Sequence, residues 1–140
     1  MTIRFFATPQ DAEAAFYEAI ERADLDAMMA IWAEDEDVLC THPGGERLAG
    51  FAAVRESWRR IFALGRRVSV RLSDAIHRPG ILLALHSMHE HYAVQGEERP
   101  RPPVIASNVY VRTPQGWRLL SRHASGAPSS PASNIPAILH

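Results

Sequence analysis

The first part of the chain carries apolar residues at helical spacing. Thr8 and Pro9 favour a helix start, because a threonine hydroxyl caps free backbone N–H groups and proline suits the first helical position. The apolar residues that follow recur at i, i+3, i+4, i+7, i+8 and i+11, which places them on one helical face. They are Ala12, Ala15, Phe16, Ala19, Ile20 and Ala23.

Two further helices and a short hairpin are predicted before residue 65. Asp24 can cap a short helix over Leu25–Ala33, and the apolar residues of Phe51–Leu64 gather on one side of a third helix. Between these helices, short apolar stretches at 38–41 and 47–49 flank a Pro-Gly-Gly turn. That arrangement predicts a strand and a short return strand.

The second half of the chain has the pattern of strands. Val68, Val70 and Leu72 alternate with polar residues, and apolar stretches at 81–94, 104–112 and 117–125 are separated by turn segments. Helices followed by strands predict an α+β fold: a cone-shaped, curved antiparallel sheet with three N-terminal helices packed on its concave face. A cone of this size has an open mouth and can hold one small ligand.

The length of 140 residues predicts one domain over 1–140, with a core at about 8–129 and an irregular tail at 130–140. The run Ile81–Leu85 is apolar without alternation, whereas a half-exposed antiparallel strand alternates. Apolar residues on both faces imply that the convex side of the sheet is covered, and Val109 and Val111 would join that outer face. The pattern therefore predicts a homodimer through the convex face.

Composition excludes several function classes. All fifteen basic residues are arginine, so Schiff-base chemistry on a lysine and a P-loop lysine are ruled out. The formal charge of -1 argues against a nucleic-acid partner, and Ile81–Leu85, the longest apolar run, is too short to span a membrane. The single cysteine, Cys40, cannot form an intramolecular disulfide, which favours a cytoplasmic location.

Several short motifs occur in a familiar order. They are Ala23-Asp24-Leu25-Asp26, Ile31-Trp32-Ala33-Glu34-Asp35, Gly50-Phe51-Ala52-Ala53-Val54-Arg55 and Ser57-Trp58. In this order and spacing they resemble the nuclear transport factor 2-like superfamily, in its SnoaL-like and ketosteroid-isomerase-like branch. The segment 116–129 is also similar to the association domain of calcium/calmodulin-dependent kinases. Functions in this superfamily range from isomerases, dehydratases and cyclases to non-catalytic binders and oligomerisation modules, so the fold does not settle the activity.

The resemblance implies that most of the isomerase chemistry is absent. Similar isomerases place an oxyanion-binding tyrosine in the first helix, where this chain has Phe16; Tyr17 is one residue off and is expected to point elsewhere. Cys40 stands where they have an aspartate base. Asn108 stands where they have a protonated aspartate, although an amide can still donate a hydrogen bond. We therefore do not expect steroid isomerisation.

His42 is the best candidate for a catalytic residue. It lies near the place of the family's base, and a histidine can move a proton near neutral pH. The alternative is that His42 only shapes its turn. Cys40 is better explained as a small buried residue than as a nucleophile, since no basic partner is evident.

A polar cluster is expected inside the cone. His123 and Ser125 are predicted to face inward with Asn108 and Tyr110, a polar group in an apolar cavity, although each could instead serve structure alone. Glu90 is expected to share the inward parity of the neighbouring alternate residues of its strand. The predicted pocket residues are Phe16, Trp58, Met88, Tyr92, Asn108, Tyr110, His123 and Ser125.

Histidines at 86, 89 and 91 invite a metal interpretation. His89 and His91 would share one strand face and could chelate one ion, with a third ligand such as His77. The spacing matches no known zinc signature, so exposed or interface histidines are the favoured interpretation. We expect no metal ligands and no cofactor.

Two functions remain. The first is a protein that binds a small, largely apolar oxygenated molecule in the cone, as an isomerase, dehydratase or cyclase using His42. The second is a non-catalytic ligand-binding or oligomerisation module. A large open cavity would favour the first, and a cavity filled by Trp58, Phe16 and Tyr92 would favour the second.

Overall fold

The computed structural model describes residues 4–128 of the chain, and the tail expected at 130–140 lies outside them. None of the helices in this described part is both long and apolar enough to cross a membrane. In chain order the elements are α1 (Pro9–Arg22), α2 (Leu25–Met29), β1 (Leu39–Thr41), β2 (Arg47–Ala49), α3 (Phe51–Ala63), β3 (Val68–Arg78), β4 (Leu83–Val94), β5 (Val104–Thr113) and β6 (Gly116–Gly126).

The helix ends follow the predicted capping residues. The Thr8 Oγ1 accepts a hydrogen bond from the Asp11 N–H at 3.0 Å, and the Asp24 side chain accepts one from the Ala27 N–H at 3.0 Å. Ala23 ends α1 in the left-handed conformation, with φ of 52°. Because of these caps, α1 ends and α2 begins with only two residues between them, so the chain turns sharply there.

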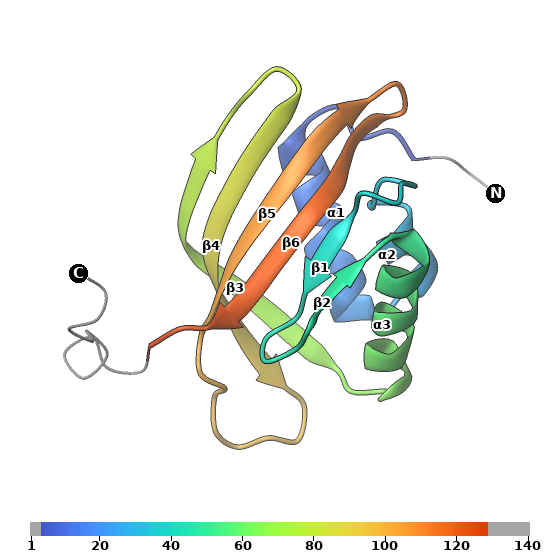
Figure 1. Ribbon diagram of the computed structural model, residues 1–140. Coiled ribbons are helices and arrows are strands. Elements are labelled where there is room, and N and C mark those ends of the chain that lie inside the picture. Colours follow the sequence, from blue (N-terminus) through green and yellow to red (C-terminus); the bar gives the residue numbers. More distant parts are fainter. Residues whose placement is uncertain (1–3, 129–140) are drawn as a thin grey trace.

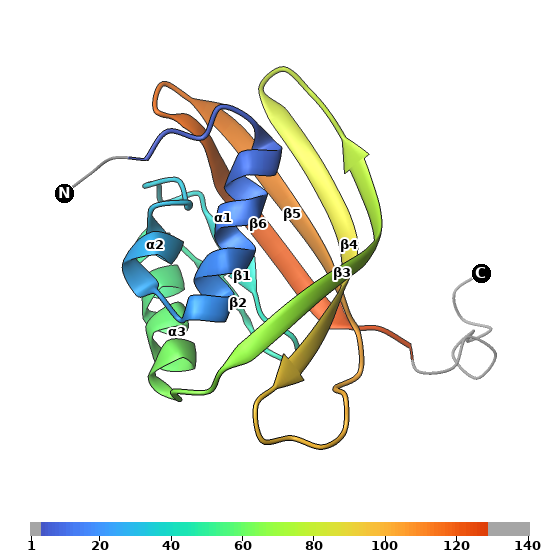
Figure 2. The same ribbon diagram turned by 180° about the vertical axis from the view of Figure 1, so that it is seen from behind.

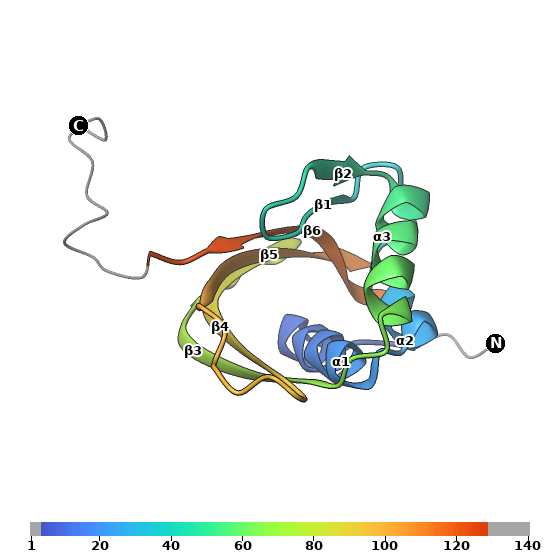
Figure 3. The same ribbon diagram turned by 90° about the horizontal axis from the view of Figure 1, so that it is seen from below.

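The six strands formed by the described residues make one sheet in the order β2-β1-β6-β5-β4-β3. Neighbours pair antiparallel except β1 and β6, which run parallel, so the sheet is mixed rather than wholly antiparallel. The parallel pair is joined by a long connection instead of a hairpin, as parallel neighbours require. The sheet curves around α1 without closing, and α2 and α3 cover the remaining side (Figures 1 and 3). The predicted cone fold is thus confirmed.

One bulge in β6 decides which of its side chains face the cone. Tyr110 of β5 pairs with Leu119, but the preceding β5 residue pairs with Ser121, so Leu120 has no partner in β5. An extra residue reverses the alternation of faces. After the bulge, Arg122 therefore points into the cone.

Strand β4 begins later than expected. The predicted strand over 81–94 starts only at Leu83, so Ile81 and Leu82 belong to the turn before it. Along β4 the even-numbered residues from Ala84 to Glu90 are buried, which places His86 and Glu90 inside the cone as the parity predicted. This strand consequently supplies polar groups to two separate points of the interior.

Candidate functional site

A buried ion pair lies at the centre of the cone. Arg122 of β6 donates from Nη1 to Glu90 Oε2 at 2.7 Å and from Nη2 to Glu90 Oε1 at 2.9 Å. The two side chains are 2% and 0% exposed. A buried charge is tolerated only when it is paired and hydrogen-bonded, and this two-point contact supplies both conditions.

Three neutral side chains, one each from α1, β4 and β5, form hydrogen bonds around this ion pair. The Tyr17 hydroxyl donates to Glu90 at 2.5 Å and the Tyr92 hydroxyl at 2.8 Å. Asn108 donates to the Tyr17 hydroxyl at 3.2 Å and accepts from Arg122 at 3.2 Å. We call these five residues the central network.

The central network keeps its charges at neutral pH. Burial opposes ionisation of both Arg122 and Glu90, but their mutual hydrogen bonds and opposite charges outweigh it, so the pKa of Arg122 is raised and that of Glu90 is lowered. Burial, together with the Glu90 charge, raises the pKa of Tyr17 and of Tyr92. The tyrosines therefore stay protonated, and the network serves as a fixed set of dipoles.

His42, directly after β1, forms a second group at the rim of the cone. Its Nε2 lies 3.0 Å from the Ser57 Oγ of α3, and its ring meets Trp58 edge-on with centroids 4.8 Å apart. The Ser57 hydroxyl donates to the Val54 carbonyl at 2.7 Å, so its single proton is already used. The His42 Nε2 must then carry the proton that it shares with Ser57, and Nδ1 keeps a free lone pair.

Electrostatics holds His42 neutral. Burial, and then the Arg122 charge, lower the pKa of His42 to about 4. Cys40 lies beside it, with Sγ 3.7 Å from Nε2, and burial raises the pKa of this thiol to about 12. The thiol is thus no nucleophile at neutral pH, whereas His42 can accept a hydrogen bond or a proton at Nδ1.

Aromatic side chains fill the space between these groups. Phe16 meets Tyr17 and Trp58 edge-on with centroids 5.0 and 5.7 Å apart, and Arg122 lies 5.0 Å above the Phe16 ring. Phe62 closes the outer side against Trp58 at 5.6 Å. The centre of the cone is therefore filled by side chains.

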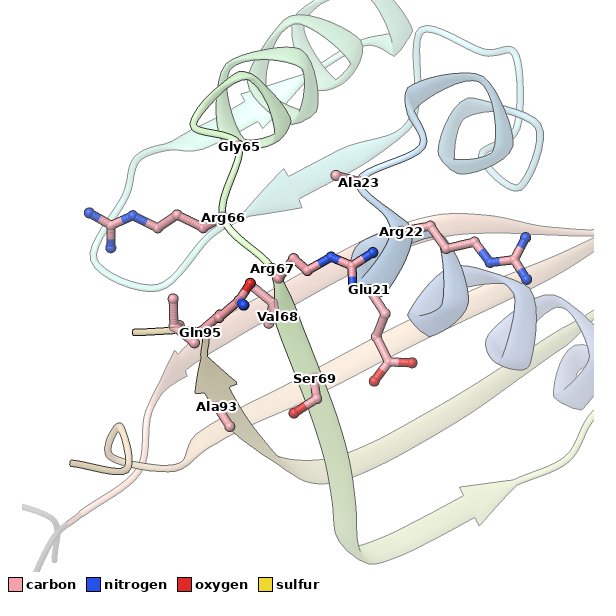
Figure 4. A pocket seen from close by; sticks show the side chains of 11 residues that line it. Glu21, Arg22, Ala23, Gly65, Arg66, Arg67, Val68, Ser69, Ala93 and Gln95 are labelled. Carbon is pink, nitrogen blue, oxygen red and sulfur yellow. The ribbon is translucent and has the colours of Figure 1, made fainter. Parts of the chain in front are cut away.

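A large surface hollow of about 730 Å³ lies away from this rim, where the end of α1 meets the start of β3 and the end of β4. Figure 4 shows that the guanidinium groups of Arg22 and Arg66 point to opposite sides of it. The Glu21 carboxylate is engaged by the Val70 N–H at 2.9 Å. Its other polar lining residues are Arg67, Ser69 and Gln95.

A third group lies under the β3–β4 hairpin. The Glu13 Oε2 of α1 is 3.2 Å from His86 Nδ1 and 3.8 Å from His77 Nε2. Burial, and then the Glu90 charge, raise the pKa of Glu13 to about 7, while burial and the neighbouring His77 lower that of His86 to about 4. Within the described part of the chain, this trio brings three possible metal-ligand atoms within 4.8 Å of one another.

Comparison with known proteins identifies the family of this chain. The SnoaL-like domain profile matches residues 10–130. The chain belongs to the SnoaL-like domain family. No protein of curated function matches it.

Solved structures agree with this SnoaL-like assignment. A candidate calcium/calmodulin-dependent protein kinase type II association domain from Thiobacillus denitrificans is 38% identical, covering 89% of this chain and 99% of its own, with a TM-score of 0.79. A candidate dehydratase of the NTF2-like family from Streptomyces avermitilis is 33% identical over 84% and 92%, with a TM-score of 0.77. An NTF2-like protein of unknown function from Pseudomonas putida, 16% identical over 90% and 88% with a TM-score of 0.76, shares the fold. The suspected superfamily is confirmed.

In this SnoaL-like chain the first helix does supply a hydroxyl to the cone. Tyr17 was expected to point elsewhere, and that expectation is wrong: it is 7% exposed and bonds Glu90 and Asn108. Phe16 is buried beside it, because the helix packs inside the curved sheet and so has a wide buried face. Cys40 is buried as well, in accord with the structural interpretation of that residue.

The predicted pocket residues divide into two groups. His123 and Ser125 are exposed on the outer face of β6, so their predicted inward orientation is wrong. The bulge at Leu120 is the cause, because it moves the inward positions of β6 to Arg122 and Ala124. The structure places the others in or on the cone interior: Phe16, Trp58, Met88, Tyr92, Asn108 and Tyr110.

The sequence interpretation missed Arg122 and Glu13. If β6 alternated without a bulge, Arg122 would face outward. Glu13 lies next to the apolar stripe of α1 but is not part of it. His89 and His91, for which the sequence favoured an exposed or interface position over a metal site, bond other side chains: His91 bonds Ser73 at 2.7 Å, and His89 lies 3.4 Å from Asp74 on the outer side.

Proposed function

We propose that this SnoaL-like protein binds a small, largely apolar oxygenated molecule at the rim of the cone and that His42 moves a proton on it. One observation carries the proposal: a neutral histidine, oriented by Ser57, meets Trp58 edge-on, and two N–H donors in the cone interior are buried without partners. These donors are Trp58 Nε1 and Arg122 Nε, for which the described residues supply no acceptor. Unpaired buried donors require an acceptor, and a ligand oxygen would be one.

The chemistry follows from these groups. A carbonyl oxygen that accepts from the unpaired donors would become more negative as a proton leaves the adjacent carbon. A histidine with a pKa near 4 is a weak base, so the C–H bond must be activated in this way. This suits an isomerase, dehydratase or cyclase, and the relative named as a candidate dehydratase supports the same class.

The proposal is tested by ligand screening and exchange. A panel of small carbonyl compounds is screened by thermal shift, and the hits are followed by NMR for deuterium uptake beside the carbonyl. His42→Gln is expected to abolish the uptake, while His123→Gln, on the exposed outer face, leaves it unchanged. Uptake that persists in His42→Gln would remove the catalytic assignment.

The second candidate is a non-catalytic binding or oligomerisation module. The packed centre of the cone favours it, because Phe16 and Trp58 occupy the space that a substrate would need. The relative named as a candidate association domain supports it as well. Hits that bind in the thermal-shift screen without any exchange in wild-type protein would select this function.

We also propose that two copies pair through the convex face of the sheet. Leu83 and Leu85 of β4 are 51% and 39% exposed there, and Ile81 and Leu82 in the adjoining turn are 81% and 66% exposed. Exposed apolar side chains gathered in one place mark interaction surfaces. Light scattering at micromolar concentration is expected to give a dimer, and Leu83→Asp to give a monomer.

We propose a cytoplasmic location, which the unpaired, buried Cys40 supports. The formal charge of -1 supports the expectation of a partner other than nucleic acid. Fractionation of the native host, with the protein detected by antibody, tests the location. Recovery outside the cytoplasmic fraction would contradict it.

A further inference from the structure

Three side chains from different elements converge under the β3–β4 hairpin. Glu13 lies on the inner face of α1, His86 on β4 and His77 on the paired position of β3. Figure 2 shows the first turns of α1 lying beside β4, so the carboxylate reaches the two imidazoles from the opposite side of the interior. Residues far apart in the sequence thus supply a carboxylate and two imidazoles at one point.

The polar atoms at this point lack partners. Glu13 Oε1, His86 Nδ1 and the nearby Tyr110 hydroxyl are buried without a hydrogen bond to any described residue. His86 is 1% exposed and Tyr110 0%, so bulk water cannot satisfy them. His86 Nδ1 is 3.2 Å from Glu13 Oε2, yet the two atoms are not aligned as a hydrogen bond. Such orphaned atoms call for a bound group.

The geometry points to a site for a divalent transition-metal ion, of the Zn²⁺ type, bound by Glu13, His77 and His86. Two imidazoles and one carboxylate are a ligand set of zinc and related ions, whereas Mg²⁺ and Ca²⁺ prefer oxygen alone. Ligands of a tetrahedral zinc ion lie about 3.3 Å apart, given metal–ligand bonds of about 2.0–2.2 Å. The separations of 3.2 and 3.8 Å are close to this value.

His77 is the ligand that adjusts. Its ring stacks on His86 with centroids 4.0 Å apart, and a stacked pair cannot direct both lone pairs at one ion. The His77 side chain is 39% exposed, so it can turn toward the carboxylate without disturbing the core. The same exposure provides an entry path from solvent and an open position for water. The site is separate from the His42 rim, so the inference does not rest on the proposed function.

The test uses tag-free, chelator-treated protein. Co²⁺ is titrated while visible absorption is recorded, and Zn²⁺ binding is measured by calorimetry. We expect one ion per chain, d–d bands typical of nitrogen and oxygen ligands, and a thermal midpoint about 5–10 °C higher at a hundredfold excess over Kd. His77→Asn and Glu13→Gln are expected to weaken binding by at least about tenfold to a hundredfold.

His89→Asn is the matched control, because it removes a half-exposed histidine from the opposite face of the same strand. It is expected to bind as the wild type does. No binding to the wild type would overturn the inference. Equal binding by wild type and His77→Asn, or loss of binding only in His89→Asn, would overturn it too, since the ion would then sit on surface histidines.

Discussion

The cone holds two buried polar clusters that differ in how completely their atoms are paired. In the central network, Glu90 receives four hydrogen bonds from three side chains, and Arg122 binds it at two points. In the Glu13–His77–His86 cluster, polar atoms of Glu13 and His86 are buried without partners. Paired atoms hold a structure together, whereas orphaned atoms cost stability and indicate a ligand.

The largest effect is expected from breaking the central ion pair. Arg122→Met leaves Glu90 buried and unpaired, which should lower the free energy of unfolding by about 3–5 kcal/mol. Urea unfolding followed by circular dichroism measures it. The double variant Arg122→Met/Glu90→Leu is the control, and it should lose clearly less because no charge is left behind. A double variant as unstable as the single one would show that packing, not pairing, sets the cost.

A smaller but substantial effect is expected from one hydroxyl of the central network. Tyr17→Phe removes a hydrogen bond to the Glu90 carboxylate and also the acceptor of Asn108. A hydrogen bond to a charged group contributes about 1.5–3 kcal/mol, so unfolding should become easier by that amount. The same urea series measures it. A change in the free energy of unfolding below about 0.5 kcal/mol would mean that the central network tolerates the loss of this hydrogen bond.

The sequence predicted several of the polar residues inside the cone, but not Arg122, Tyr17 or Glu13, and not how these groups pair. Periodicity and caps sufficed for α1 and for the inward face of β4, because both depend on local spacing. The bulge at Leu120 lies in the pairing of β6 with the preceding strand β5, and the alternation of apolar residues does not reveal it. It reverses the faces to which His123 and Arg122 point. Glu13 was missed for a similar reason, since only the curved sheet brings a histidine to it.

The pH dependence of stability tests whether the His42 ring is neutral in the folded protein. Its pKa is lowered to about 4 in the folded state from about 6.5, so the folded protein prefers the neutral ring. Its contribution is therefore present above pH 6.5 and is lost as the pH falls toward 4, by on the order of 2–3 kcal/mol. Unfolding of wild type and His42→Gln is compared from pH 7 to pH 4.

The difference in free energy of unfolding between the wild type and His42→Gln should change with pH, because only the wild type carries the imidazole ring. His123→Gln is the control, since that side chain is exposed on the outer face of β6. A constant difference between the wild type and His42→Gln would mean that the His42 ring is solvated in the folded protein, and the proposed role as a neutral base would lose its support.

The smallest effect is expected from Tyr110, the buried tyrosine beside the Glu13–His77–His86 cluster. Tyr110 is buried like Tyr17, but its hydroxyl makes no hydrogen bond of regular geometry among the described residues, although a weaker interaction with the Asn108 side chain opposes the rise of its pKa. In metal-free protein, Tyr110→Phe should therefore change the free energy of unfolding by less than about 0.5 kcal/mol, or raise it slightly, because an unsatisfied buried group is removed. A loss above about 1 kcal/mol would show that the hydroxyl is bonded. Since the two substitutions delete the same atom, the difference between them measures pairing alone.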